Sequence, residues 1–377
     1  MVAQRTQEVE ISGIRKMFEA APAHSINLGL GEPDFNPAPE VIEALCSAVR
    51  GGKNHYGPSA GLPELRDKIA ERYREQDPGT SRDNVIVTAG GSEGLMSAAL
   101  AFYDPGTEVL VPNPGFVLYA PHARLAGAVP VPYSLLAVRK YLPDFDELEQ
   151  LVSPRTRAIV VNSPSNPTGA VFPRAVVDRL VAFADHHNLT IISDEVYEEI
   201  YYDTPATSFW GRSDRVVIAN SFSKTLAMTG WRMGFLVAPR PLAIALNKIH
   251  YHIMACPSTP AQVAVLEGLS NGSGALDAMV KEFRARRALV VQLLGKVPGL
   301  SLVPPSGAFY AFPRFEWPHT ATEVAQALLG RGLITTPGDA FGSLGASHLR
   351  LSFAASRKNI RDGLKILRAY AEETARS

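Results

Sequence analysis

The sequence contains only two cysteines, Cys46 and Cys256, among its 377 residues. Two cysteines cannot make a disulfide framework, and they fit a reducing compartment. No CxxC pair is present, and the nine histidines show no zinc-binding spacing. We therefore expect neither a disulfide-stapled fold nor a bound metal ion.

The sequence also lacks an excess of charge of either sign and any long apolar run. Lys plus Arg and Asp plus Glu both total 37, so the formal net charge is zero. No chain-wide basic excess is available to concentrate nucleic acid or an anionic membrane surface. The apolar runs fall far short of the roughly 20 residues that cross a bilayer, and the polar segment 1–10 differs from a secretory signal. We expect a cytoplasmic protein that acts on small molecules and binds neither nucleic acid nor membrane.

Short apolar runs alternate with helical stretches from about residue 85 onward. The runs are 84–88, 108–111, 157–161, 189–192, 215–219 and 234–237, and the helical stretches include 93–102, 116–126 and 173–187. The runs are continuous and rich in β-branched residues, which is typical of strands buried on both faces of a parallel sheet. Pro173 suits the first turn of its helix. The alternation predicts an α/β layered domain.

The pattern changes beyond about residue 275. The predicted elements there are a long helix at 275–296, short strands around 302, 309 and 349, and an amphipathic helix at 356–375. At roughly 150 residues per domain, the length predicts about two domains. We expect a large domain over 40–280 and a smaller α+β domain made of 1–39 and 281–377.

Polar and reactive side chains follow the predicted strands. The segments are Gly90-Gly-Ser92, Asn113-Pro-Gly-Phe116, Asn162-Ser-Pro-Ser-Asn166, Asp194-Glu-Val-Tyr197 and Ser221-Phe-Ser-Lys224. Ligands of open α/β sheets gather at the carboxyl ends of the strands. Each segment alone is compatible with a turn or a helix cap. Five of them at one edge of a sheet indicate a ligand site.

Two of these segments are suited to an anion. Gly90-Gly-Ser92 precedes a predicted helix, where free N–H groups and the helix dipole attract negative charge, although Ser92 could instead be an ordinary N-cap. Ser221 and Lys224 bring a hydroxyl and an amine, and Arg232 brings a guanidinium suited to bidentate phosphate contact. A lone lysine of this kind is usually solvated, and only the surrounding segment argues for a role.

Two charged residues stand in apolar surroundings. Asp194 closes an apolar strand, where a carboxylate is costly unless it is paired, and it could otherwise cap a helix. Arg350 lies inside the apolar run 349–353 and is either an edge residue with an extended side chain or a buried receptor for a carboxylate.

The motifs resemble, in order, the signatures of the class I/II aminotransferases, the aspartate aminotransferase family of fold-type I pyridoxal-phosphate enzymes. They are Leu30-Gly-Glu-Pro-Asp34, Tyr56-Gly-Pro-Ser-Ala-Gly-Leu-Pro-Glu-Leu-Arg66, Ser163-Pro-Ser-Asn-Pro-Thr-Gly169, Ser193-Asp-Glu-Val-Tyr197, Ser221-Phe-Ser-Lys224, Gly230-Trp-Arg-Met-Gly234 and Leu349-Arg-Leu-Ser-Phe353. The resemblance covers nearly the whole chain. It implies a mostly parallel seven-stranded sheet sandwiched by helices in the large domain, a smaller α+β domain from both chain ends, and pyridoxal 5'-phosphate as cofactor.

The resemblance also implies roles around the cofactor ring. Lys224 would form a Schiff base with the cofactor and carry the proton between the substrate Cα and the cofactor carbon. Asp194 would pair with the pyridinium nitrogen. Tyr197 and Asn166 would hydrogen-bond the phenolic oxygen, and Phe116 would stack on the ring.

Further roles concern the phosphate, the substrate and the subunit partner. By resemblance, the phosphate would be held by Gly90, Gly91, Ser92, Ser221 and Arg232. Tyr56 would reach it from the neighbouring subunit, so a homodimer is expected. Arg350 would clamp the substrate α-carboxylate, helped by Asn166 and the backbone of Gly31.

The expected reaction is ping-pong transfer of an amino group between an L-amino acid and a 2-oxo acid such as 2-oxoglutarate. Aspartate-like, aromatic and aliphatic donors all stay open, because acidic-substrate relatives often carry a lysine where this chain has Ser92. A pyridoxal-phosphate β-lyase or decarboxylase on the same fold is the alternative. The Gly57-Pro-Ser-Ala-Gly61 segment matches the serine-hydrolase pattern, but a loop precedes it instead of a strand.

Overall fold

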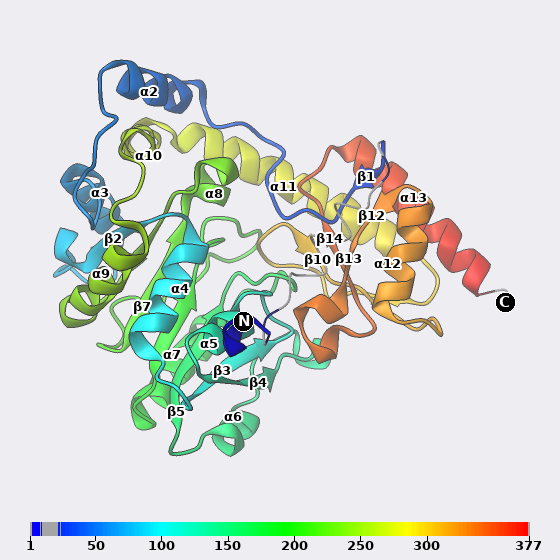
Figure 1. Ribbon diagram of the computed structural model, residues 1–377. Coiled ribbons are helices and arrows are strands. Elements are labelled where there is room, and N and C mark those ends of the chain that lie inside the picture. The colour runs from blue at the N-terminus through cyan, green and yellow to red at the C-terminus, as the bar shows by residue number, and fades with distance from the viewer. Residues whose placement is uncertain (1, 8, 10–21, 23, 376–377) are drawn as a thin grey trace.

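The centre of the molecule is a seven-stranded sheet, seen in a computed structural model that describes residues 2–7, 9, 22 and 24–375 (Figure 1). In order across the sheet the strands are β2 (Val85–Thr88), β8 (Gly234–Val237), β7 (Val216–Ser221), β6 (Thr190–Asp194), β5 (Thr156–Asn162), β3 (Glu108–Asn113) and β4 (Val129–Ser134). Among these seven strands, only β8 runs in the direction opposite to the others. The predicted α/β fold with a mostly parallel seven-stranded sheet is confirmed.

Helices cover both faces of this sheet. On β5, Ile159 and Val161 pack into one hydrophobic cluster, whereas Ala158 and Val160 pack into another on the opposite face. The face of Ala158 is covered by α4 (Gly91–Phe102), α5 (Tyr119–Leu125) and α9 (Arg240–Met254). The other face is covered by α2 (Pro39–Arg50), α3 (Pro63–Tyr73), α6 (Phe145–Leu151), α7 (Arg174–His186), α8 (Phe222–Thr225) and α10 (Thr259–Asn271). Burial on both faces explains why the strands read as continuous apolar runs.

A third hydrophobic cluster lies beside the sheet and is built mainly from the C-terminal third of the chain. Its elements are α11 (Ser273–Leu294), β9 (Leu300–Ser301), β10 (Tyr310–Ala311), β11 (Arg314–Phe315), α12 (Ala321–Gly330), β12 (Leu333–Ile334), β13 (Thr336–Pro337), β14 (Leu349–Ser352) and α13 (Arg357–Thr374). The N-terminal strand β1 (Ile26–Asn27) joins it by parallel pairing with β12. The predicted domains, 40–280 and 1–39 with 281–377, stay a proposal, and their boundary at residue 280 falls within α11. Residues 1, 8, 10–21, 23 and 376–377 lie outside the described residues.

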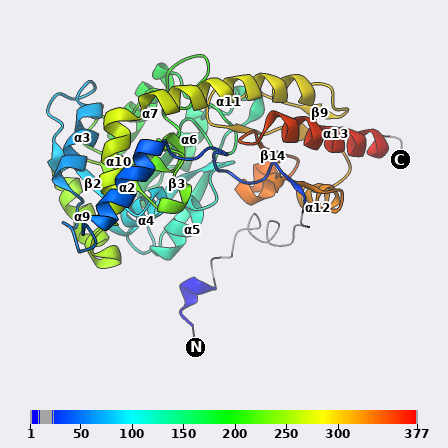
Figure 2. The same ribbon diagram turned by 90° about the horizontal axis from the view of Figure 1, so that it is seen from above.

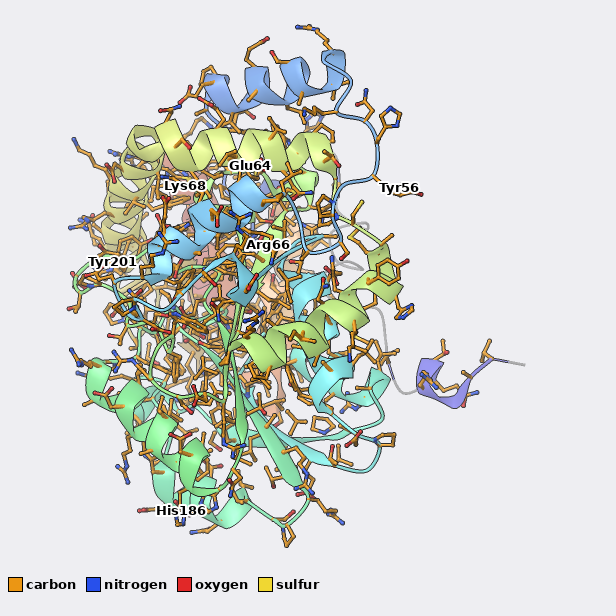
Figure 3. All side chains as sticks on the ribbon, turned by 90° about the vertical axis from the view of Figure 1, so that its left-hand side faces the viewer. Tyr56, Glu64, Arg66, Lys68, His186 and Tyr201 are labelled. Atoms are coloured by element: carbon orange, nitrogen blue, oxygen red, sulfur yellow. The ribbon has the colours of Figure 1, made fainter. Side chains whose placement is uncertain are left out.

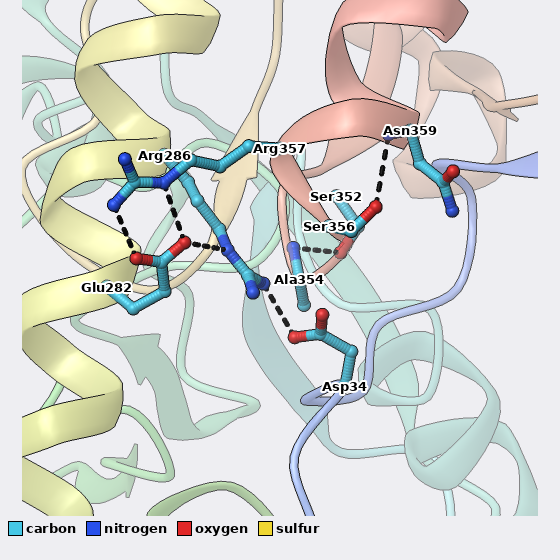
Figure 4. Close-up of polar contacts among 8 residues, drawn as sticks. All are labelled: Asp34, Glu282, Arg286, Ser352, Ala354, Ser356, Arg357 and Asn359. Atoms are coloured by element: carbon cyan, nitrogen blue, oxygen red, sulfur yellow. Dashed lines mark hydrogen bonds and ion pairs between the residues drawn. The ribbon is translucent and has the colours of Figure 1, made fainter.

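The long helix α11 runs along the molecule from α10 toward β9 and connects the two regions (Figure 2). Polar contacts fasten it to the segments beside it (Figure 4). Glu282 on α11 accepts hydrogen bonds from Nε of Arg286 at 2.9 Å and from Nε of Arg357 at 2.9 Å. Arg286 in turn donates to Asp34 at 2.6 Å. Two carboxylates and two guanidinium groups thus join α11, the start of α13 and the N-terminal segment.

Some element boundaries differ from the sequence prediction. The edge strand β4 was not predicted, and the helix expected from residue 116 begins only at Tyr119, because residues 116–118 form a turn. Pro173 is the N-cap of α7 and not its first helical residue. The short 3₁₀ helices are η1 (Gln4–Thr6), η2 (Arg82–Asn84), η3 (Ala137–Arg139), η4 (Thr229–Trp231), η5 (Gly338–Phe341) and η6 (Ser343–Gly345). Among the described residues, no helix combines the length and the apolar character needed to cross a membrane.

Candidate active site

A cavity of about 270 Å³ opens at the carboxyl ends of the central strands. The predicted site residues that line it are Gly31, Gly91, Ser92, Phe116, Asn166, Asp194, Tyr197, Ser221, Lys224, Arg232 and Arg350. The parallel strands β6 and β7 end on Asp194 and Ser221, which brings residues that are far apart in sequence to one edge of the sheet. The volume is close to the lower end of the range of small-molecule sites.

Lys224 lies on the one-turn helix α8 that follows β7 directly. Its Nζ donates a 2.5 Å hydrogen bond to the carbonyl oxygen of Gly31, which comes from the N-terminal segment. Loss of hydration inside the cavity lowers the pKa of the Lys224 amine to about 8. At pH 7 roughly a tenth of this amine is therefore neutral and nucleophilic, far more than for an ordinary lysine.

Asp194 is a buried carboxylate at the end of β6. Oδ2 accepts a 2.7 Å hydrogen bond from the phenol of Tyr119, and Oδ1 accepts one from the backbone N–H of Val196 at 3.2 Å. Burial raises the pKa of Asp194 to about 6, and the two hydrogen bonds oppose this rise. A turn and not a helix follows Asp194, so this residue is not a helix cap.

Two tyrosines that line the cavity contact each other. The hydroxyl groups of Tyr197 and Tyr310 are 2.7 Å apart, and both rings are buried. The guanidinium carbon of Arg350 lies 4.6 Å from the centre of the Tyr310 ring. A side chain at Gly31 would collide with the Tyr310 hydroxyl, so the N-terminal segment can approach only because this residue is glycine.

Arg350 projects from the central strand β14 and is almost fully buried. Nη1 donates to Oδ1 of Asn166 at 3.0 Å, and Nη2 donates to the carbonyl oxygen of Gly29 at 2.5 Å. Its Nε has no hydrogen-bond partner within the described part of the chain. A buried guanidinium with no carboxylate among these hydrogen-bond partners is a suitable receptor for an anionic ligand group.

The N-terminus of α4 forms a cradle with Arg232. Gly90 caps α4 with φ of 79°, and a Cβ at this position would lie 2.5 Å from Nη2 of Arg232. Arg232 itself has a left-handed backbone, with φ of 57°, and donates to the carbonyl oxygen of Thr229 at 2.9 Å. A strained backbone at a residue whose side chain faces a cavity is common at ligand sites. Free N–H groups, a guanidinium and the Ser221 hydroxyl fit a phosphate group.

Two predicted site residues do not line this cavity: Gly90, which precedes the lining residue Gly91, and Tyr56, which stands apart from it. Tyr56 lies on the loop before α3 with 91% of its surface exposed, and it points away from the molecule (Figure 3). An exposed tyrosine held out from the surface is compatible with contact to a second subunit.

Comparison with known proteins gives the family. A family model described as "Aminotransferase class I and II" matches residues 23–367. The chain belongs to this family. The probable aspartate aminotransferase of Methanocaldococcus jannaschii is 37% identical over 99% of this chain and 100% of that protein, and the aromatic-amino-acid aminotransferase 2 of Thermococcus litoralis is 35% identical over 99% and 98%. The crystal structure of aspartate aminotransferase from Thermotoga maritima superposes with a TM-score of 0.92, at 35% identity over 98% of this chain and all of that one.

The chain is therefore a transaminase, as the sequence predicted, and the lyase or decarboxylase alternative is not favoured. The roles predicted for individual residues stay predictions, although the cavity brings most of them together. Sequence reasoning missed Tyr119 and Tyr310 as part of this aminotransferase site. Both contacts join residues distant in the chain, and no local motif signals them.

Proposed function

We propose that this transaminase uses pyridoxal 5'-phosphate, bound through Nζ of Lys224, to move an amino group between an L-amino acid and a 2-oxo acid. The observation that carries the proposal is that Lys224, Asp194 and Arg350 face one cavity beside the N-terminus of α4. When bound, the cofactor would supply an aldehyde that accepts the substrate amine and a ring that delocalises the electron pair released at Cα.

The N-terminus of α4 is the proposed phosphate site. The N–H groups of Gly91 and Ser92 point out of the first turn of the helix, where the dipole favours an anion. Arg232 would add its guanidinium, and the Ser221 hydroxyl would join the donors by turning from its 3.0 Å hydrogen bond to the carbonyl oxygen of Met233. Gly90 leaves the space that lets Arg232 approach this end of the helix.

The ring would lie between these donors and the two tyrosines. Asp194 would hold a proton on the ring nitrogen, with its carboxylate oriented by Tyr119. Phe116, which lines the cavity, would stack on the ring. Tyr197 and Asn166 would donate hydrogen bonds to the phenolic oxygen.

Lys224 would act twice. Its amine, with a pKa of about 8, can bind the cofactor as a neutral nucleophile. Once the substrate amine has taken its place, Nζ can carry the proton from the substrate Cα to the cofactor carbon. Its hydrogen bond to the Gly31 carbonyl keeps the amine directed into the cavity between these steps.

Arg350 would bind the α-carboxylate of the amino acid. Its position is fixed by Asn166 and Gly29, and its side chain lines the cavity. Because the Arg350 guanidinium is buried, it would select a ligand with a carboxylate over one with a neutral group. The same contact would serve the oxo acid, because both substrates carry this group.

For the side chain of the donor we propose an aspartate-like, aromatic or aliphatic amino acid, with 2-oxoglutarate as one acceptor. Relatives named as aspartate and as aromatic-amino-acid aminotransferases support this range. Ser92 stands in the cavity wall, where a lysine would favour a second carboxylate.

We further propose a cytoplasmic homodimer in which Tyr56 reaches the phosphate of the neighbouring subunit. The exposure of Tyr56 supports this arrangement, because a large ring of this kind gains from burial at an interface. The two cysteines, which are both free, support a reducing compartment.

The deciding experiment is an absorption spectrum of the purified protein with added pyridoxal phosphate, followed by single amino acids without an oxo acid. We expect a visible band of bound cofactor that is lost with the true donors and persists with the others. Lys224→Ala should bind cofactor only non-covalently and lose turnover, whereas the exposed Lys248→Ala should behave as wild type. Absence of any bound chromophore in wild type, or full activity of Lys224→Ala, would overturn the proposal.

A further inference from the structure

A fully buried histidine on α9 contacts the first turn of α4. Nδ1 of His250 lies 3.1 Å from Oε1 and 3.2 Å from Oε2 of Glu93. Nε2 lies 2.9 Å from the carbonyl oxygen of Ser59, in the loop that carries Tyr56. A carbonyl oxygen can only accept a hydrogen bond, so Nε2 carries a proton.

The surroundings of Glu93 determine the second ring nitrogen. Oε2 of Glu93 accepts a hydrogen bond from the backbone N–H of Ala89 at 3.1 Å, and Oε1 accepts one from the Ser97 hydroxyl at 2.5 Å. Both oxygens thus accept hydrogen bonds, as those of an ionised carboxylate can. An ionised Glu93 can only accept from Nδ1, so this geometry suits a ring with N–H groups on both nitrogens, and the contact is then a buried ion pair.

Glu93 lies in the same helical turn as two residues that line the cavity, so its charge affects the binding of an anion there. Glu93 is the third residue of α4, and its carboxylate reaches back to the residue before the Gly90 cap. Gly91 and Ser92 in the same turn line the cavity, whereas Glu93 faces α9 on the other side of the helix. A carboxylate charge here offsets the helix dipole and repels an anion bound at the same helix end.

We propose that His250 is a positioning residue that neutralises Glu93 and so keeps the N-terminus of α4 attractive to a phosphate group. The proposal rests on the proposed function, since it takes the cofactor phosphate as the anion bound there. His250 acts through Glu93 and touches no cavity atom of its own. Its second hydrogen bond, to Ser59, fastens the loop of Tyr56 to the same helix pair.

The test compares pyridoxamine phosphate with pyridoxamine, two ligands that differ only in the phosphate, by equilibrium binding to the apoprotein. We expect His250→Gln to weaken binding of pyridoxamine phosphate about tenfold and to change binding of pyridoxamine less than about twofold. The double variant His250→Gln/Glu93→Gln removes both charges and should regain most of the phosphate affinity. His252→Gln, on the exposed side of the same helix, is the control.

Equal losses for the two ligands in His250→Gln, or no recovery in the double variant, would show that His250 only supports the packing and would overturn the proposal. Should the single variant fail to fold, ¹⁵N NMR of histidine-labelled wild type decides: two protonated ring nitrogens support the proposal and one bare nitrogen contradicts it. A wild-type protein that binds neither ligand would instead overturn the proposed function, and the NMR spectrum together with binding of inorganic phosphate would still test His250.

Discussion

The phenol of Tyr119 donates a 2.7 Å hydrogen bond to Oδ2 of Asp194 inside the core of the molecule. This bond lowers the pKa of a carboxyl group that burial raises to about 6. In Tyr119→Phe the pKa of Asp194 should rise further. As the pH falls, Asp194 would then lose its charge at a higher pH than in wild type, and with it the pairing to a protonated ring nitrogen. We expect kcat to fall about tenfold or more at neutral pH, with a larger loss at pH 6 than at pH 8.

Steady-state kinetics across this pH range checks the effect of Tyr119→Phe. Tyr133→Phe is the matched control, because the Tyr133 phenol is equally buried but donates to the backbone oxygen of Val160. A pH-independent loss, or the same loss in Tyr133→Phe, would mean that the Tyr119 hydroxyl serves only the packing.

A comparison of Gly90 with Gly106 separates the effect of a steric clash from the effect of an unfavourable backbone conformation. Both have φ of 79°, but a Cβ at Gly90 would lie 2.5 Å from the Arg232 guanidinium, whereas one at Gly106 would meet nothing within 4 Å. Both substitutions to alanine should cost about 1–2 kcal/mol in unfolding free energy, because the left-handed backbone is unfavourable for alanine. Only Gly90→Ala should also weaken cofactor binding, by about tenfold or more, because Arg232 is displaced.

Thermal or denaturant unfolding and titration with pyridoxal phosphate measure the two effects in parallel. Cofactor affinity that falls equally in Gly106→Ala, or stays unchanged in Gly90→Ala, would contradict a phosphate site at this helix end.

The sequence predicts the sheet well because its strands are buried on both faces and therefore appear as continuous apolar runs. The edge strand β4 lacks this pattern, because Pro130 and Pro132 alternate with its valines. An edge strand tolerates proline, since the missing N–H groups leave no neighbouring strand without a hydrogen-bond donor. The start of α5 is likewise set by a turn at 116–118 that no local signal marks.

The site is predictable where its residues stand in motifs at the strand ends, as Asp194 and Lys224 do. Tyr119 and Tyr310 are different. They meet Asp194 and Tyr197 from 75 and 113 residues away in the chain, so their roles depend on the packing of whole elements. The pair of His250 and Glu93, separated by 157 residues, is hidden for the same reason.

Arg350→Lys tests the proposed receptor for the substrate carboxylate. Lysine keeps the charge but lacks the planar fork that contacts Asn166 and a carboxylate together. We expect KM for both the amino acid and the oxo acid to rise about 30-fold or more, which corresponds to about 2 kcal/mol, with a smaller change in kcat. The control is Arg314→Lys, an arginine with about half of its side chain exposed. A lower kcat at unchanged KM would place the substrate carboxylate elsewhere.

Glu282 should make the stability of the protein depend on pH. Hydrogen bonds and charge from Arg357 and Arg286 lower the pKa of this carboxyl group to about 2 (Figure 4). Because the pKa is lower in the folded than in the unfolded state, the contribution is present in full above about pH 5 and is lost as the pH falls from about 4.5 toward 2. Glu282→Gln should therefore lower the unfolding free energy by about 1 kcal/mol at pH 7, and the difference from wild type should shrink at pH 4 and below.

Denaturant unfolding between pH 7 and pH 3.5 measures this difference. The control is Glu316→Gln, at a more exposed ion pair, which should show almost no effect. A difference that stays constant down to pH 3.5 would mean that the ionised form of Glu282 does not fasten α11 to α13.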